Sequence, residues 1–331
     1  MSVDSVYGKF SIVDIATPLF AYALGVYTYS SGAYYEDLWS LKISDGGTQT
    51  KLVDYSALSN NEVASPRFSP DYSQVCFINF LVSGTEDLCV VNADGTGLTV
   101  LDTQAIINDA PQWHPGGQQV YYRIANSVYR IDVTGANKTL IISVGAGSRG
   151  WGFNHDASLM AYINAAGSLV VANSDGSSPT TIVASGATSG SYDDSVVWSR
   201  TSNVLFYRNG TDWRKINSDG TGDTTIDATR QGYIGRYAMS STNTIIFYVD
   251  TTVFASWELW QMPVSGSGAT AVSPTRNPFR NVNYPVSVAE NRIFVMDNTT
   301  NNIWSVLEDG SDYRIDVLAL IGPPVEEYPA F

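Results

Sequence analysis

The stretch Phe68-Ser-Pro-Asp-Tyr-Ser-Gln-Val-Cys-Phe77 contains the pattern that decides the fold. Phe68 is followed by Ser-Pro-Asp, which predicts a chain reversal because proline fixes φ and aspartate bonds to the nearby backbone. The triplet Val75–Phe77 then predicts a strand whose first and third residues share one face. Downstream, Asp94-Gly95 offers the positive φ that a tight hairpin needs, and Leu98–Leu101 predicts a closing strand. The unit therefore predicts four short antiparallel strands.

The same unit recurs along the chain. Its signature is a large apolar residue, a strand triplet that begins seven positions later, and a turn that contains glycine. The apolar residues of the successive copies are Val13, Phe68, Trp113, Phe153, Trp198, Met239 and Val286. The turn glycines stand at positions 46, 95, 135, 176, 220, 266 and 310, spaced by 49, 40, 41, 44, 46 and 44 residues. This spacing is the period of a four-stranded propeller blade.

Seven copies predict an all-β fold: a seven-bladed β-propeller with four-stranded antiparallel blades around a central channel. One blade cannot bury both of its faces, whereas a ring gives every sheet two neighbours. We expect one domain over residues 1–320 and a Pro-rich C-terminal tail over residues 321–331. The blades are predicted near residues 10–56, 62–103, 108–144, 149–185, 193–229, 234–275 and 281–320.

Two segments, Phe68-Ser-Pro-Asp71 and Val91-Asn-Ala-Asp-Gly-Thr-Gly97, closely resemble the TolB-like, WD40-like (PD40-type) propeller repeat. The resemblance covers roughly residues 10–320 and is strongest in the second blade. The same blade occurs in periplasmic TolB, in peptidase propeller domains and in some polysaccharide lyases. The resemblance therefore implies a fold and does not imply one function.

Charge and composition limit the kinds of partner. The formal net charge is −14, so the protein repels phosphate backbones, and we expect no nucleic-acid partner. No apolar stretch approaches 18 residues, so we expect no membrane insertion. The N-terminus lacks a basic segment followed by an apolar run, so we expect synthesis in a cytoplasm without a signal peptide.

Histidine and cysteine give little support for catalysis or metal binding. The only two histidines, His114 and His155, both fall within predicted chain reversals. Oligogalacturonate lyases share the seven-bladed architecture, but that family builds its metal site from several histidines, which this chain lacks. Cys76 and Cys89 lie in strands of one predicted hairpin, and we expect buried free thiols. We predict no catalytic residue, metal or cofactor.

Two motif matches have simpler interpretations. Gly145–Gly150 fits the dinucleotide-binding pattern, but Trp151–Phe153 follows as a predicted strand where that motif needs a helix, so we treat the match as chance. The Asp-Gly turns lack the alternating acidic ligands of a calcium loop. No Gly-x-Ser-x-Gly nucleophile elbow is present, which excludes the peptidase relatives as functional models.

The candidate site lies just before the first strand of each blade, because these positions ring the mouth of the central channel in a propeller. The predicted mouth residues are Glu62, Asp109, Arg149, Asp194, Arg236 and Arg280. Mixed charge at this place suits a polar ligand or a peptide end. It also suits a solvated rim, in which each carboxylate bonds a neighbouring backbone.

The leading hypothesis is a non-enzymatic binding or scaffold propeller for protein or glycan partners. The sequence does not define the oligomeric state. Residues 25–37 and 250–258 are predicted to be long connections rich in aromatic residues, which are favoured in contacts. In the tail, Val325, Tyr328 and Phe331 are candidate docking residues for this propeller or another subunit. An acidic propeller with a docking tail would suit a large assembly such as a virus or phage particle.

The alternative is a carbohydrate-active enzyme, a polysaccharide lyase or glycosidase, with its site at the channel mouth. In that hypothesis tyrosine and arginine serve as base and charge neutraliser in place of histidine. Convergence of Tyr237, Arg236 and Arg149 with a carboxylate would favour it. The sequence favours the non-enzymatic reading.

Overall fold

The computed structural model describes most of the repeat region. The described residues are 11–12, 19–28, 33–42, 48–55, 62–81, 83–104, 107, 110–145, 149–187, 196–199, 201–210, 212–227, 237–240, 245–250, 258–266, 270–271, 287–289, 292–297, 302–307, 309, 311 and 314–317. All regular structure in these ranges is β-strand. They contain no helix long and apolar enough to cross a membrane.

The strands follow one another in groups of four, which we call blades A to G. Blade A contains β1 (Ser11–Ile12), β2 (Leu19–Thr28), β3 (Ala33–Lys42) and β4 (Thr48–Val53). Blade B contains β5 (Glu62–Phe68), β6 (Gln74–Phe80), β7 (Glu86–Asn92) and β8 (Thr99–Gln104). Blade C contains β9 (Gln112–Trp113), β10 (Gln119–Ile124), β11 (Ser127–Asp132) and β12 (Thr139–Ser143), and blade D contains β13 (Arg149–Phe153), β14 (Leu159–Ile163), β15 (Leu169–Asn173) and β16 (Thr180–Val183).

The second half of the chain repeats this arrangement. Blade E contains β17 (Val196–Trp198), β18 (Val204–Asn209), β19 (Asp212–Asn217) and β20 (Thr224–Asp227). Blade F contains β21 (Tyr237–Met239), β22 (Ile245–Asp250), β23 (Glu258–Pro263) and β24 (Thr270–Ala271), and blade G contains β25 (Ser287–Ala289), β26 (Arg292–Asp297), β27 (Asn302–Leu307) and β28 (Arg314–Val317).

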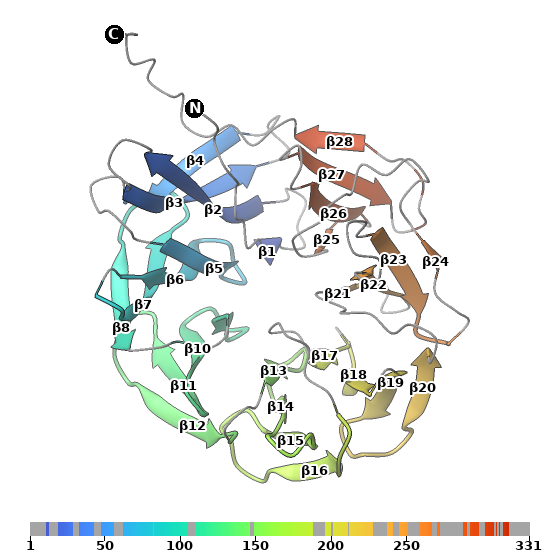
Figure 1. Cartoon of the computed structure of the whole chain (residues 1–331). Helices are drawn as coiled ribbons and strands as arrows, with labels where there is room; N and C mark the ends of the chain where they lie inside the picture. Colours follow the sequence, from blue (N-terminus) through green and yellow to red (C-terminus); the bar gives the residue numbers. More distant parts are fainter. Residues whose placement is uncertain are drawn as a thin grey trace, which may run out of the picture.

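These blades form a β-propeller. Each is an antiparallel sheet in which consecutive strands are neighbours. First strands such as β5, β13 and β25 lie nearest the centre, whereas fourth strands such as β12, β16 and β28 form the rim (Figure 1). Strand β1 of blade A contacts β25 of blade G, which brings the first and last blades together. The all-β prediction, with four-stranded antiparallel sheets in a propeller, is confirmed.

Alternating side chains of each strand supply two different interblade cores. In blade B, Phe77 and Cys89 pack against blade A, whereas Cys76 and Leu88 pack against blade C. This follows from the two-residue period of a strand. The two cysteines therefore face opposite sides of one sheet, and both are buried and free, as predicted.

First-strand tryptophans also link blades by hydrogen bonds. Trp113 Nε1 donates to the carbonyl oxygen of Arg67 at 2.9 Å, and Trp198 Nε1 donates to that of Gly152 at 3.0 Å. Each bond joins a first strand to the first strand of the preceding blade. In blades C and E, the large apolar residue that marks the repeat therefore links its blade to the preceding one.

The reversal between first and second strands is closed by side chains. In blade B, Ser69 Oγ donates to Asp71 Oδ1 at 2.6 Å and accepts the N–H of Gln74 at 3.0 Å. In blade D, Asn154 Oδ1 accepts the N–H of Leu159 at 2.9 Å. The predicted chain reversals are confirmed, and their polar residues have a structural use.

The predicted Asp-Gly hairpins are also confirmed. Asp94 Oδ1 accepts the N–H of Thr96 at 2.9 Å and its hydroxyl at 2.6 Å, while Gly95 has φ +84°. The same pair of bonds occurs at Asp175, Asp219 and Asp309. A Cβ atom on Gly95 would lie 3.1 Å from the carbonyl oxygen of Lys51, so this turn sits against the outer strand of the preceding blade.

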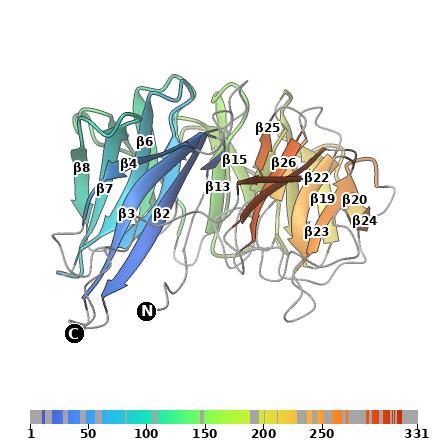
Figure 2. The same cartoon turned by 90° about the horizontal axis from the view of Figure 1, so that it is seen from above.

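One segment that was expected to be a connecting loop forms a hairpin of two long strands. Residues 25–37 were predicted to form a long loop, but β2 and β3 each contain ten residues and pair continuously to Thr28↔Ala33. They reach beyond the neighbouring strands in the edge-on view (Figure 2). The prediction of a loop was wrong because tyrosine, valine and threonine favour the strand conformation. Most of the other expected loop, residues 250–258, lies outside the described residues.

Candidate functional site

The predicted mouth residues are only partly described. Glu62 begins β5, is exposed, and pairs with Phe80 at the end of the sheet opposite the Asp-Gly turns. Arg149 begins β13 in the same way. Blade C separates the blades that carry these two residues. The other predicted mouth residues (Asp109, Asp194, Arg236 and Arg280) and the tail residues (Val325, Tyr328 and Phe331) lie outside the described residues. The mouth site stays a prediction.

Both histidines lie in chain reversals, as predicted. His114 Nδ1 accepts the N–H of Gly116 at 3.0 Å, and the imidazole stacks on Tyr121 with ring centroids 6.1 Å apart. Burial lowers the pKa of His114, and the nearby positive charge of Arg130 lowers it further. The imidazole is therefore neutral at pH 7 and fills space between blades C and D. His155 occupies the corresponding turn of blade D.

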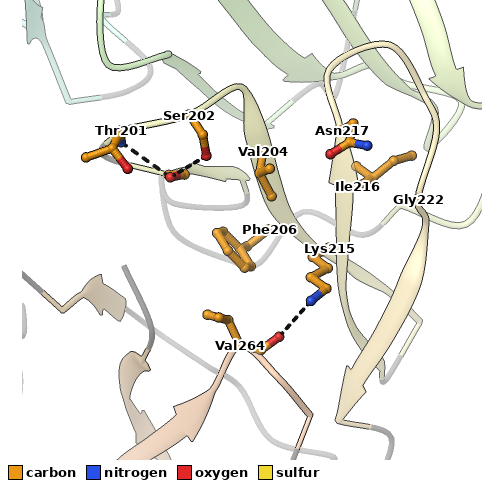
Figure 3. A pocket seen from close by; sticks show the side chains of 10 residues that line it. Thr201, Ser202, Val204, Phe206, Lys215, Ile216, Asn217, Gly222 and Val264 are labelled. Carbon is orange, nitrogen blue, oxygen red and sulfur yellow. Dashed lines mark hydrogen bonds between the residues drawn. The ribbon is translucent and has the colours of Figure 1, made fainter. Parts of the chain in front are cut away.

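A cavity of about 320 Å³ lies between blades E and F. It lies at the end of the blades that carries the reversing turns and the Asp-Gly turns, opposite the predicted mouth. Figure 3 shows the cavity beside β18, with the turn residue Val264 of blade F across from it. Its lining comprises Ser199, Thr201, Ser202, Val204, Phe206, Lys215, Ile216, Asn217, Gly222 and Val264. Hydroxyl, amide and ammonium groups thus surround an apolar floor.

The repeat explains why space is left there. Ser199 follows the first-strand residue Trp198 just as His114 follows Trp113. In blade C the imidazole of His114 covers Tyr121, whose place in blade E is taken by Phe206. A hydroxymethyl group is smaller than an imidazole ring. The exchange of histidine for serine therefore leaves room between blades E and F.

Lys215 provides the cationic group of this cavity. It pairs with Phe206 across β18 and β19, and its Nζ donates to the carbonyl oxygen of Val264 at 3.1 Å (Figure 3). Ion pairs with carboxylates are formed by Lys51 with Asp37, by Lys138 with Asp102 and by Arg214 with Asp223. Within the described part of the chain, Lys215 has a neutral carbonyl as its contact instead.

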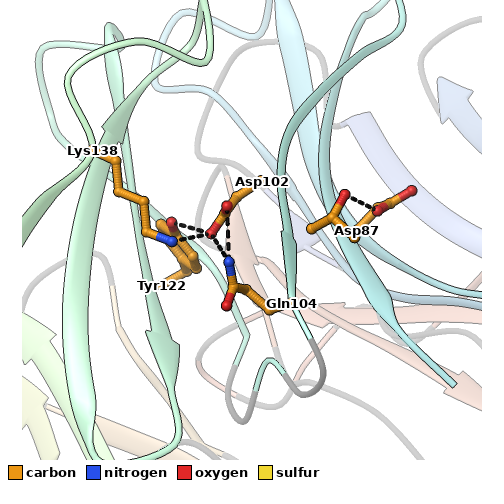
Figure 4. A network of polar contacts seen from close by, with 6 residues as sticks. Asp87, Asp102, Gln104, Tyr122 and Lys138 are labelled. Atoms are coloured by element: carbon orange, nitrogen blue, oxygen red, sulfur yellow. Dashed lines mark hydrogen bonds and ion pairs between the residues drawn. The ribbon is translucent and has the colours of Figure 1, made fainter.

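A second polar cluster joins blades B and C. Asp102 Oδ2 accepts the hydroxyl of Tyr122 at 2.6 Å, the ammonium of Lys138 at 2.7 Å and the amide of Gln104 at 3.0 Å (Figure 4). The ammonium also lies 5.1 Å from the ring centroid of Tyr129. Since Asp102 comes from β8 and its partners Tyr122 and Lys138 belong to blade C, this cluster holds two blades together.

Removing the charge of Asp102 should destabilise the protein in a pH-dependent way. Burial alone would raise the pKa of Asp102, but the hydrogen bonds from Lys138, Tyr122 and Gln104 outweigh it, and the pKa is lowered. A lowered pKa in the folded state means that the stabilisation is fully present above the unfolded value of about 3.9 and is lost as pH falls through the folded value. We expect Asp102→Asn to lower the free energy of unfolding by about 1.5 kcal/mol at pH 7.

Urea unfolding at pH 7 and at pH 3 checks this expectation. The difference between the parent and Asp102→Asn should shrink at pH 3, because this pH lies below the unfolded value and the parent must then release the proton of Asp102 when it folds. Glu62→Gln removes one negative charge from an exposed position and controls for the effect of net charge. An equal difference at both pH values would contradict the assigned role of Asp102.

Comparisons with known proteins bear on the fold. No protein-family model matches the chain, and a comparison with curated proteins by sequence gives no match either. A prolyl endopeptidase structure has a TM-score of 0.63 at 10% identity, covering 95% of this chain and 50% of that one. A chain of a mitotic checkpoint complex has a TM-score of 0.58 at 16% identity, covering 94% and 89%.

TolB from Acinetobacter baumannii is also similar, with a TM-score of 0.52 at 13% identity, covering 78% of this chain and 64% of that one. The present chain thus spans about half of the prolyl endopeptidase chain and less than two thirds of the TolB chain. At such low identities these likenesses concern the fold. They confirm the predicted resemblance at the level of the fold: the chain is a β-propeller and is similar in fold to TolB.

Proposed function

We propose that this chain is a non-enzymatic scaffold that binds protein partners through its propeller, and that the ring is one seven-bladed domain with the blade boundaries expected from the sequence. The observation that carries the proposal is the structural role of the polar residues in the repeat. The Ser, Asp and Asn side chains described above close turns or join blades, which makes a rigid support. Such a support presents surface residues such as Glu62 in fixed positions.

The fold comparisons support this proposal. One of the similar chains is matched over 89% of its own length and belongs to a mitotic checkpoint complex, which is an assembly of proteins. A propeller suits such a role because its loops and strand ends offer contact surface at both ends of the ring. The tail segment 321–331 extends the proposal: it would dock the propeller in a large, cytoplasmically built assembly such as a virus or phage particle. A glycan remains the second kind of partner in this proposal.

The test locates the partner on the propeller. The tagged parent, purified from its own source, should elute with a second protein in a fixed ratio, as measured by light scattering and mass spectrometry. Glu62→Lys and Arg149→Glu should weaken that complex by roughly tenfold, the loss typical of one interface charge pair. Gln118→Lys, in the exposed reversing turn of blade C at the opposite end of the blades, is the control for a change of charge and should bind as the parent does.

Two results would contradict the scaffold proposal. One is a parent protein that elutes alone from its own source at the concentration found there. The other is a complex that survives both mouth substitutions unchanged, which would remove the channel mouth from the proposal.

The carbohydrate-active enzyme is the second candidate. The observation in its favour is that Arg149 and Tyr237 both begin first strands, β13 and β21, at the mouth end of their blades. Cleavage of an acidic polysaccharide by the parent and its loss in Arg149→Ala would establish this function in place of the scaffold. Absence of cleavage in the parent would dismiss it.

A further inference from the structure

We propose that the cavity between blades E and F binds a small organic carboxylate, with the Lys215 ammonium as the partner of the carboxylate. This site lies at the end of the blades opposite the predicted mouth. It involves none of the predicted mouth residues, so the mouth site and the cavity site can each fail alone.

The size and lining of the cavity suit such a ligand. Its volume of about 320 Å³ is at the lower end of the range for small-molecule sites. Val204, Phe206 and Val264 belong to the apolar cluster between blades E and F and offer an apolar surface for a carbon skeleton. Ser199 and Ser202 offer hydroxyl groups that are already hydrogen-bonded to each other at 2.9 Å, so these groups are held in place before a ligand binds.

Blade C shows what the residue equivalent to Lys215 faces in another part of the propeller. Arg130 occupies the same position in blade C, opposite Tyr121. Hydrogen bonds from Ser177 lower the pKa of Asp175 in the turn of blade D, and the positive charge of Arg130 lowers it further. That cation therefore has a carboxylate in the turn of the next blade.

Blade F lacks this carboxylate. Ser265-Gly266 stands where blade D has Asp175-Gly176, and both glycines have a positive φ. The cationic position is kept as Lys215, whereas the anionic position has become serine. A bound carboxylate would supply the charge that Asp175 supplies at the junction of blades C and D.

One cation favours a monovalent group over a phosphate. A phosphate carries more charge, and the net charge of −14 opposes its approach. The carboxylate can come from a free acid or from an acidic side chain of a partner. Both sources share this chemistry, and the experiment separates them.

The experiment measures acetylation of Lys215 by an amine-reactive reagent, followed by peptide mass spectrometry. The probes are D-glucuronate with glucose as its neutral match, and the capped peptide Gly-Glu-Gly with Gly-Gln-Gly as its match. At about twice the Kd of a carboxylate probe, two-thirds occupancy should slow acetylation of Lys215 roughly threefold. Lys138, which is paired with Asp102, is the internal control and should be unaffected.

Two variants test whether the cavity itself is responsible. Ser265→Asp introduces the carboxylate that blade D has at this position, and Ser199→His introduces the ring that blade C has. Both should abolish protection of Lys215 by the carboxylate probes. Thermal unfolding shows that each variant is folded, and Ser265→Asp should raise Tm because Asp at this turn position accepts the N–H two residues later in blades B, D and E.

Protection by glucuronate alone identifies a free acid as the ligand, and protection by the glutamate peptide alone identifies a partner's side chain. Either result supports the site. Equal protection by the neutral matches, protection that persists in both variants, or no protection by either carboxylate probe would overturn it.

Discussion

Gly176→Ala should lower the free energy of unfolding by about 3–5 kcal/mol, a large share of the stability of an ordinary domain. Two causes act together. Gly176 has φ +83°, where an L-residue costs roughly 1–2 kcal/mol. A Cβ atom there would also overlap the backbone carbonyl of Ile141 in β12, on the preceding blade. Ile141 is the bulged residue of β12, between Leu140 and Ile142, which both pair with β11, so its carbonyl cannot move far without disturbing that pairing.

Gly84→Ala separates the two causes. Gly84 has φ +80°, but no atom lies within 4 Å of the position of its Cβ. We expect a cost of about 1 kcal/mol, which reports the backbone conformation alone. Urea unfolding of both variants measures the difference. Equal costs would show that the structure accommodates the added methyl group between the turn of blade D and β12 without a further loss of stability.

The regular part of the fold could be predicted from the sequence because residues that close the same turns recur in successive repeats. Ser69 and Asp71 close a reversal within a few residues, and Asp94-Gly95 closes a hairpin in the same way. These interactions are local, so residue type and spacing are enough to identify them. The β2–β3 hairpin was not predicted because residues 25–37 resemble a long connection rich in aromatic residues, whereas strand pairing continues to Thr28↔Ala33.

The cavity could not be predicted so directly, because it depends on residues from two blades. Ser199 leaves space only because Phe206 lies under it, and Lys215 meets a carbonyl only because its neighbour is the turn of blade F. An alignment of the repeats does contain a signal, namely serine in place of His114 and serine in place of Asp175. The signal becomes meaningful when the structure shows that these positions face one another.

Trp213→Ala should lower the free energy of unfolding by about 4 kcal/mol, within the range for large buried aromatic residues. Trp213 is only 1% exposed and belongs to the core that joins blades E and F. Its partners there include Phe206, Ile226 and Met262. Removal of the indole leaves a void that these side chains, fixed in paired strands, can fill only in part.

Two further variants provide reference values for the loss of stability expected of Trp213→Ala. Trp213→Phe keeps an aromatic ring and should cost roughly half as much, since part of the void remains filled. Leu140→Ala truncates a side chain that is 52% exposed on β12, and should change stability by less than about 0.5 kcal/mol.

The form of the unfolding curve tests the ring as well as the residue. In an open array of repeats, one weak junction would let the two sides unfold separately. In the ring, β1 contacts β25, so blades E and F remain connected through the other blades when their own junction is weakened. Trp213→Ala should therefore shift the urea midpoint and keep a single transition. Two separate transitions would show that the contact between blades A and G is too weak to make all the blades unfold together.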